Sequence, residues 1–386
     1  PPPVPWQVVQ PAYNLLVTPP DGTLSGNGRE GLWDYDTRIL SLYRLTIDGI
    51  EPEYVSSGVP ESDRWFGALR VRRGGGTPEG PALPEDAVVL TIERRVGCGM
   101  EETLHVANHA MTPLDAALAL EIDADFIDVQ EIGRKRLHHG EVRRGSDPDT
   151  GELRLDYHAA HGTATLHRAL RVRVIHADSP PFIEATTLRF PLRLPAGGEW
   201  RATLSYHSLV DGAWREPLPS APDGGTERDL ERDRWRAVRT RLDASHPAVE
   251  AACEHAAEDL FALRNWEYDT APDAWHPKAG APTYSGVFGR DALTAAWQGA
   301  LLGPEMLRGA IATIGKTQAD RDSAWRDEEP GKLIHEIRRG PLSELDLIPQ
   351  RGYYGTQTTP AMFVLALSEA WHWPGDAEPL RRSLAV

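Results

Sequence analysis

The sequence predicts two parts, an antiparallel β-sandwich followed by part of an α/α toroid. Its 386 residues exceed what one compact domain usually holds. Apolar residues alternate with polar ones, or form short β-branched runs, as far as Leu209, and from Leu230 onward they recur three and four residues apart. We therefore expect a β-sandwich domain over residues 1–220, a linker helix over 221–245 and the N-terminal part of the toroid over 246–386.

The first half shows the period of two that is typical of strands, with turn residues between the runs. The Gly- and Asx-rich turns 146–151 and 195–198 accept the positive φ angles of tight hairpins, so we expect the strands on either side of each turn to pair. The Gly/Pro-rich stretch 73–84 is expected to be an exposed loop, and 216–226 a linker between the domains. The expected strands are 13–18, 39–48, 88–96, 102–108, 117–123, 152–158, 163–176, 186–194 and 200–207.

The second half shows helical spacing together with start and stop signals. Its first helix is charged and one-sided, and we expect it to strap the two domains together. Cys253 follows the apolar spacing of the second helix and is expected to lie in the core. Thr359 and Pro360 are expected to be the N-cap and first residue of the last helix. Long aromatic and acidic loops separate some helices; plain bundles rarely need such loops, and this favours a toroid. The expected helices are 230–242, 249–263, 291–302, 304–317 and 361–373.

Composition excludes several classes of protein. The 41 Lys+Arg and 57 Asp+Glu give a net charge of -16, which repels phosphate backbones and anionic lipid, so we expect no nucleic-acid partner and no membrane partner. Two cysteines are too few for a disulfide framework, and no run of about 18 apolar residues offers a membrane span, which predicts a soluble, cytoplasmic protein. Metal-ligand spacing, nucleophile elbows and nucleotide-binding loops are not found, so we expect no metal site and no cofactor.

The densest chemical cluster is the segment 280–291, which ends where a helix is expected to begin. Its aromatic, Gly-rich approach carries Tyr284 and delivers Arg290 and Asp291 to the helix N-terminus. Asp291 can cap the helix, or it can stay ionised beside Arg290 and accept hydrogen bonds from a ligand hydroxyl. The residues alone leave the structural and the binding interpretations open.

A second cluster, 325–340, gathers acids and bases around a Pro-Gly turn. Such a charge run is often a solvated face. It also has what a polyol site requires, because Glu329 and Glu336 can accept hydrogen bonds from hydroxyls, Lys332 and His335 can donate them, and Trp325 can stack on a sugar ring.

A third cluster, 351–360, again precedes a helix. Its paired Tyr353 and Tyr354 can pack in a core or form an aromatic platform for a ligand. In the β half, the Asp-Arg pairing in 31–38 is interpreted mainly as a structural turn or an element of the domain interface.

These motifs resemble the bacterial glycogen-debranching, amylo-α-1,6-glucosidase-like family. The family's Ser-x-x-Phe-Gly-Arg-Asp motif is matched by 285–291, its Glu-Glu-Pro-Gly-Lys-x-x-His-Glu-x-Arg motif by 328–338, and its Tyr-Tyr-Gly-Thr stretch before Thr-Pro by 353–360. The N-terminal region is also similar, through 31–38 and 123–128. Two carboxylates of the family pattern are replaced, at Gln357-Thr358 and at Gly340-Pro341.

The resemblance implies a glycoside hydrolase of the debranching type that acts on α-glucans or oligosaccharides, by an inverting mechanism and with an (α/α)6 toroid. It implies that Arg290 and Asp291 bind the terminal sugar. General acid and base are expected on toroid loops beyond this segment, so we expect the chain to be a fragment that lacks its catalytic residues. The alternatives are an inverting sugar phosphorylase and a carbohydrate-binding protein without catalysis. The candidate substrate-binding residues are Tyr284, Arg290, Asp291, Glu329, Lys332, His335, Glu336, Tyr353 and Tyr354.

Overall fold

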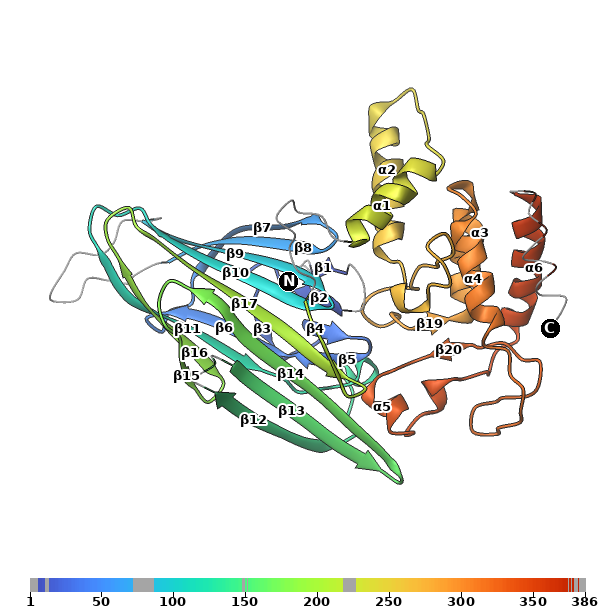
Figure 1. The fold of residues 1–386 in the computed structure, drawn as a ribbon, viewed down its shortest axis with the longest axis horizontal. Helices are drawn as coiled ribbons and strands as arrows, with labels where there is room; N and C mark the ends of the chain where they lie inside the picture. The colour runs from blue at the N-terminus through green and yellow to red at the C-terminus, as the bar shows by residue number, and fades with distance from the viewer. Residues whose placement is uncertain are drawn as a thin grey trace. The chain divides into compact units, whose positions relative to one another are not determined.

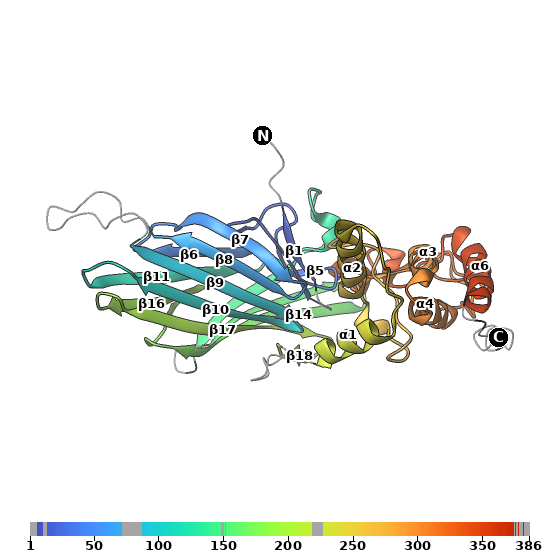
Figure 2. The same ribbon diagram turned by 90° about the horizontal axis from the view of Figure 1, so that it is seen from above.

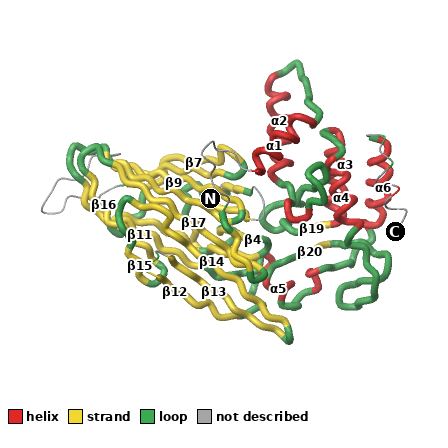
Figure 3. The backbone as a smooth tube through the Cα atoms, viewed as in Figure 1, coloured by secondary structure: helices red, strands yellow, loops and turns green. Residues whose placement is uncertain are grey.

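The computed structural model describes residues 6–10, 14–71, 87–147, 150, 152–217, 227–373, 375, 377 and 381. The chain divides into two compact units, one built of strands that ends at residue 218 and one of helices that begins at residue 219 (Figures 1 and 3). The predicted order, an antiparallel sheet-rich region followed by a helical part, is therefore confirmed. The toroid stays a prediction.

Antiparallel sheets make up the β unit. The largest runs β12-β13-β14-β17-β10-β9-β8-β7, with β18 also on β17; a second runs β15-β16-β11-β6-β3 and a third β1-β2-β4-β5. The strands are β1 Gln7–Val9, β2 Asn14–Thr18, β3 Leu24–Ser25, β4 Gly31–Asp34, β5 Thr37–Leu40, β6 Leu42–Ile47, β7 Glu53–Glu61, β8 Arg64–Arg70, β9 Val88–Gly97, β10 Gly99–Asn108, β11 Leu114–Asp123, β12 Gly140–Asp147, β13 Glu152–His161, β14 Ala164–Ala177, β15 Phe182–Glu184, β16 Thr187–Leu194, β17 Glu199–Val210 and β18 Ala213–Arg215.

A buried core lies between the inner faces of the two larger sheets. Strands of both sheets alternate buried and exposed residues, so each sheet has one apolar face. Phe190 on β16 and Trp200 on β17 meet edge to face with ring centroids 5.3 Å apart. Figure 2 shows the long strands of the unit running side by side. This arrangement is the sandwich that the alternating pattern predicts.

One of the two predicted hairpins is wrong. Residues 195–198 do form a turn, closed by the hydrogen bond from Gly198 N to Pro195 O at 3.0 Å. The flanking strands, however, belong to different sheets, because β16 pairs with β11 and β15 whereas β17 pairs with β10 and β14. The turn is a corner between the two layers. At the other predicted hairpin β12 and β13 pair up to Asp147 and Glu152, while residues 148, 149 and 151 of its turn, like the predicted loop 73–84 and residues 218–226 of the predicted linker, lie outside the described residues.

The helical unit packs around a cluster of aromatic and small apolar side chains. Trp235 stacks on Phe261 at 5.3 Å and meets Trp275 edge to face, which makes the first helix part of this core. Helices α3, α4 and α6 pack against one another. The helices are α1 Glu227–Val238, α2 Pro247–Ala262, α3 Gly289–Gln298, α4 Glu305–Gly315, α5 Pro341–Glu344 and α6 Thr358–His372, with the short strands β19 Val287–Phe288 and β20 Glu336–Ile337.

The core position predicted for Cys253 is wrong. Cys253 is only half-buried, and its neighbour on the expected apolar face, Val249, is exposed. The buried residues of α2 are Ala257, Phe261 and Ala262, near its C-terminal end, because only that end reaches the aromatic cluster. No helix in the described part of the chain combines the length and the apolarity that crossing a bilayer demands.

Candidate functional site

Main-chain hydrogen bonds bring the three polar clusters of the helical unit together. Strand β19 pairs with β20, with Phe288 opposite Glu336, and Gly289 N donates to His335 O at 2.8 Å. On the other side of the same segment, His335 N donates to Tyr353 O at 2.7 Å and Tyr353 N to Glu336 O at 3.0 Å. Figure 1 shows β19 and β20 beside each other below α3 and α4. Segments that are far apart in sequence therefore share one small ladder.

Two glycines make this close approach possible. A Cβ built on Gly286 would lie 2.3 Å from Ile337 O, and one built on Gly289 would lie 2.1 Å from Ile334 O and 2.7 Å from Thr359 Cγ2. Real side chains do not tolerate such distances to backbone atoms. The glycines of the 285–291 motif are thus required because the neighbouring main chain lies where a side chain would stand.

Arg290 and Asp291 lie in the first turn of α3. The capping interpretation expected Asp291 to be the N-cap of this helix, and the structure shows that it is not. The helix begins at Gly289 with Phe288 as its cap residue, so Asp291 is the third helical residue. The ladder with β20 holds the chain extended up to Phe288, which sets this earlier start. Arg290 Nη2 donates to both Asp291 oxygens at 3.2 and 3.3 Å, and the Asp291 side chain is 36% exposed. The carboxylate is therefore held by a cation and by the helix dipole while solvent reaches it.

The Pro-Gly turn of the second cluster carries a tightly bonded acid that the sequence analysis missed. Asp327 adopts a positive φ of 50°, and its Oδ2 accepts a hydrogen bond from the Tyr353 hydroxyl at 2.7 Å. Lys332 Nζ donates to Asp327 O at 2.9 Å and to Glu329 Oε1 at 3.1 Å. The predicted residues Glu329, Lys332 and Tyr353 are thereby joined through Asp327. Hydrogen bonding to this carboxylate raises the pKa of Tyr353, so its hydroxyl stays a donor.

Arg338 was also missed, and it links three segments of the site. Its Nε donates to Glu336 Oε2 at 2.8 Å, its Nη1 donates to Thr283 O at 2.9 Å, and its guanidinium lies 5.1 Å from the centre of the Phe288 ring. Both Arg338 and Glu336 are largely buried. The family motif contains this arginine, so the signal was present. Only the pairing of β19 with β20 shows what it holds.

The remaining predicted residues divide into exposed and packed groups. Tyr284 is half-exposed and meets Phe288 edge to face at 5.4 Å, and His335 Nδ1 donates to Gly355 O at 3.0 Å. Tyr354 instead packs against the apolar core of the unit, and its burial raises its pKa. Of the two tyrosines, Tyr353 lies with the polar residues and Tyr354 with the core.

The helix after the third cluster begins earlier than Thr359. Helix α6 starts at Thr358, and the Thr356 hydroxyl accepts from the Thr358 and Thr359 amides at 3.2 and 3.4 Å. Thr356 therefore performs the capping that the sequence assigned to Thr359, which is fully buried against Gly289.

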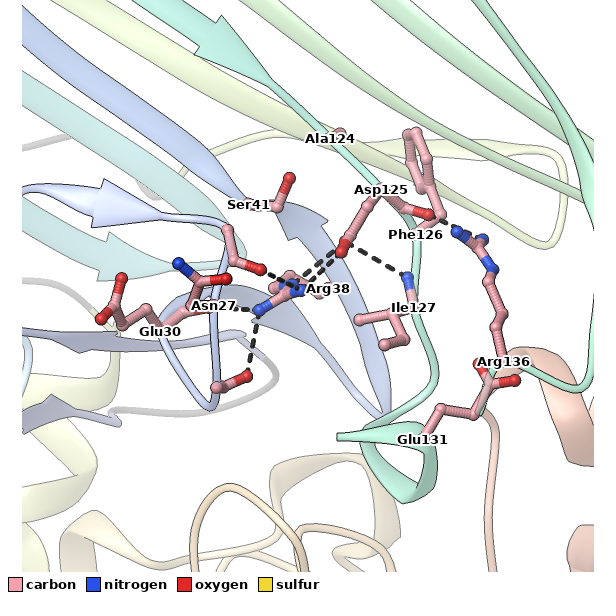
Figure 4. Close-up of polar contacts among 12 residues, drawn as sticks. Asn27, Glu30, Arg38, Ser41, Ala124, Asp125, Phe126, Ile127, Glu131 and Arg136 are labelled. Atoms are coloured by element: carbon pink, nitrogen blue, oxygen red, sulfur yellow. Dashed lines mark hydrogen bonds and ion pairs between the residues drawn. The ribbon is translucent and has the colours of Figure 1, made fainter. Parts of the chain in front are cut away.

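In the β unit, the two motifs that carried the resemblance meet at Arg38 (Figure 4). Its Nε donates to Asp125 Oδ1 at 3.0 Å, while its terminal nitrogens donate to the carbonyls of Gly26, Gly28 and Glu30 at 3.0 to 3.1 Å. The main chains also join, through Arg38 N to Ile127 O at 3.0 Å. The segment 31–38 is mostly strand, because β4 and β5 pair with each other and only residues 35–36 form the turn between them; the predicted turn is therefore shorter than expected.

A family model described as the N-terminal domain of (some) glycogen debranching enzymes matches residues 11–205, half of the chain. The chain belongs to this glycogen-debranching family. The match covers most of the β unit, including Arg38 and its partner Asp125. No curated protein sequence matches the chain.

Solved structures extend the likeness to the helical unit of this family member. The structure titled "Putative kojibiose phosphorylase from human microbiome" covers 96% of the chain at 12% identity with a TM-score of 0.59, and the chain spans 54% of that protein's length. At this identity the match shows the fold. A galactose mutarotase-like protein from Clostridium acetobutylicum (7% identity, 51% of this chain and 93% of that one, TM-score 0.25) and a GH92-family glycosyl hydrolase (12%, 96% and 51%, 0.33) were also found.

Proposed function

We propose that the chain belongs to an inverting glycoside hydrolase of the debranching type, and that the polar cluster of its helical unit binds the terminal glucose of an α-glucan. The observation that supports this best is the small ladder, which gathers the three clusters around Glu336 and His335. In these clusters Asp291 and Glu329 offer exposed acceptors and Lys332 offers a donor. Sugar hydroxyls both donate and accept, so a site of this mixed character suits them.

The acids of the cluster are suited to binding hydroxyls. Inversion requires a protonated carboxylic acid and a second carboxylate about 6.5–9.5 Å apart, with room for water between them. Glu336 is bonded to Arg338 at 2.8 Å and Glu329 to Lys332 at 3.1 Å. Each carboxylate is thus already an acceptor in a bond to a cationic side chain, which is the role that a hydroxyl-binding acid has. We therefore assign neither residue as the general acid.

Binding of maltooligosaccharides to the purified 386-residue chain tests the assignment of Asp291. Asp291→Ala should weaken affinity at least tenfold, because the carboxylate offers exposed acceptor atoms, and should leave the melting temperature nearly unchanged, because Asp291 does not cap α3. Asp273→Ala, which removes an exposed aspartate paired with Arg308, is the matched control. Equal affinity in Asp291→Ala and wild type would contradict the binding role.

A second candidate, an inverting sugar phosphorylase, is favoured by the fold match to the structure titled as a kojibiose phosphorylase. The two activities differ in the group that attacks the anomeric carbon, water in one and phosphate in the other. Glycogen limit dextrin, maltooligosaccharides and an α-1,6-linked glucoside, each incubated with and without inorganic phosphate, separate them. Free glucose supports the hydrolase and sugar phosphate the phosphorylase. Binding without either product supports a carbohydrate-binding role for this chain.

We place this function in a reducing compartment such as the cytoplasm. Cys98 and Cys253 are the two cysteines of the chain, too few for the disulfide framework that is typical of proteins from oxidising compartments.

A further inference from the structure

A pair of histidines lies on adjacent strands at one end of the largest sheet, in the β unit. His158 on β13 is directly opposite His167 on β14, and their rings stack with centroids 4.1 Å apart. Asp156 precedes His158 by two residues on the same strand, and residues two apart on a strand point to the same face. The hairpin therefore places two imidazoles and one carboxylate on one surface.

The three side chains converge within reach of one ion. One ligand atom from each lies within 4.8 Å of the other two, and His167 Nε2 is 2.9 Å from Asp156 Oδ1. His158 is exposed and the other two are half-buried, so the group is open to solvent. Bound to a tetrahedral ion with arms of about 2.0–2.1 Å, ligand atoms stand roughly 3.3 Å apart. Small side-chain rotations close that difference.

We propose that Asp156, His158 and His167 form a binding site for a divalent transition-metal ion of the zinc type. Two imidazole nitrogens and one carboxylate oxygen are ligands that zinc and its neighbours favour, whereas magnesium and calcium require sites built of oxygen. The ion takes the place of the proton between His167 Nε2 and Asp156 Oδ1. An imidazole that binds an ion through Nε2 carries its single ring proton on Nδ1.

The neighbouring charges keep the carboxylate oriented. Arg154 Nε donates to Asp156 Oδ2 at 2.6 Å, and its Nη2 donates to Oδ1 at 2.8 Å. When the ion occupies Oδ1, the bond to Oδ2 remains and fixes the carboxylate, as hydrogen bonds to metal-bound carboxylates commonly do. On β12, Glu141 is opposite His158 and bonded to Arg143 at 2.9 and 3.0 Å. The two arginines are thus each neutralised by a carboxylate, and the imidazoles supply uncharged ligands.

Zinc binding by the purified 386-residue chain, measured by calorimetry at pH 7.5 and by competition with a chromophoric chelator, tests the site. We expect one zinc ion per chain at this site, and at least tenfold weaker binding in His158→Ala and in His167→Ala. Because the ion binds the folded hairpin, zinc should also raise the melting temperature of the wild type, while magnesium should not.

His176→Ala is the matched control. His176 is exposed at the other end of β14 and bonded to Asp178 at 3.2 Å, and it tests whether any histidine-aspartate pair of this sheet suffices. Its zinc affinity should equal that of the wild type. Far-UV circular dichroism checks that each variant is folded. If His158→Ala does not fold, His158→Gln replaces it in the binding measurement. Either no saturable zinc binding, or binding that both histidine variants retain, would overturn the proposal.

Discussion

Replacing Arg338 tests whether one buried guanidinium holds the candidate site together. Arg338→Met keeps much of the aliphatic volume and removes the charge that bonds Glu336 and the Thr283 carbonyl at 2.8 and 2.9 Å. The Glu336 side chain is only 12% exposed, so it would be left as a poorly solvated, unpaired anion. Breaking such a pair by removing one partner costs roughly 3–5 kcal/mol, and we expect about 3 kcal/mol because some water reaches Glu336.

Hydrogen exchange followed by mass spectrometry measures this loss where it should occur. About 3 kcal/mol corresponds to roughly a hundredfold lower protection of the amides in the ladder, such as Gly289 N, which donates to His335 O. The double variant Glu336→Gln/Arg338→Met removes the stranded charge and should recover part of the protection.

Arg308→Met is the control, because its ion pair with Asp273 spans 3.4 Å and is exposed, and it should change protection by no more than about 0.5 kcal/mol. If Arg338→Met behaved like Arg308→Met, or if the double variant lost as much as the two single variants added together, the reasoning would be refuted.

Three further predictions concern stability of the whole chain in urea. His276 is fully buried, and burial lowers its pKa to about 4, below its unfolded value. The contribution of the neutral ring to the free energy of unfolding is complete above pH 6.5, and about 3 kcal/mol of that free energy is lost as the pH falls to 4. His276→Asn should abolish this loss. Glu102→Gln leaves the buried Arg94, 2.8 Å away, without a counter-charge and should cost about 3 kcal/mol or more; a loss under about 1 kcal/mol would contradict this. Gly289→Ala forces a Cβ to 2.1 Å from a main-chain oxygen and should cost about 1–3 kcal/mol, whereas Gly145→Ala, with nothing within 4 Å, should be neutral; equal effects would refute the packing argument.

Most strands with one buried face could be predicted from the sequence, although β8 was missed, and the edge strands β7 and β12 could not. Residues of β9 and β16 alternate cleanly because one side of each packs in the core. Strands β7 and β12 end the largest sheet and are mostly exposed, so no burial imposes alternation on them. The short strand β4 resembled a turn in the sequence, because its Gly31 and Asp34 are residues typical of turns, although the whole strand is buried.

Turn chemistry predicted where the chain reverses but not what it pairs with afterwards. The glycines of 195–198 permit the turn, and the choice between a hairpin and a corner depends on where the apolar faces of β16 and β17 are buried. Whether the turn becomes a hairpin or a corner depends on the packing of the whole sandwich, so no pattern in the local sequence predicts it.

The sequence predicted three separate polar clusters, but it did not predict that the three lie side by side in the structure. No local pattern shows that Phe288 pairs with Glu336. Without that pairing, nothing distinguishes Arg338 from the other charged residues of the cluster. The histidine pair differs, because a hairpin with Gly162 at its turn already places positions 158 and 167 opposite each other. Counting residues outward from that turn on both strands is enough to bring the two histidines together.

Strand β17 has a consequence for the order in which the chain acquires its structure. It lies between β14 and β10, so it joins the hairpins made by β7 to β10 with those made by β12 to β14. Until the ribosome has made residues 199–210, both groups end in an open edge, and β10 waits roughly a hundred residues, about 5–20 seconds of synthesis, for its second neighbour. We expect a protease to cut readily within β10 in nascent chains stalled before residue 199. Chains in which residue 210 has left the exit tunnel should resist this cleavage. Equal sensitivity of the two would show that the sheet assembles without β17.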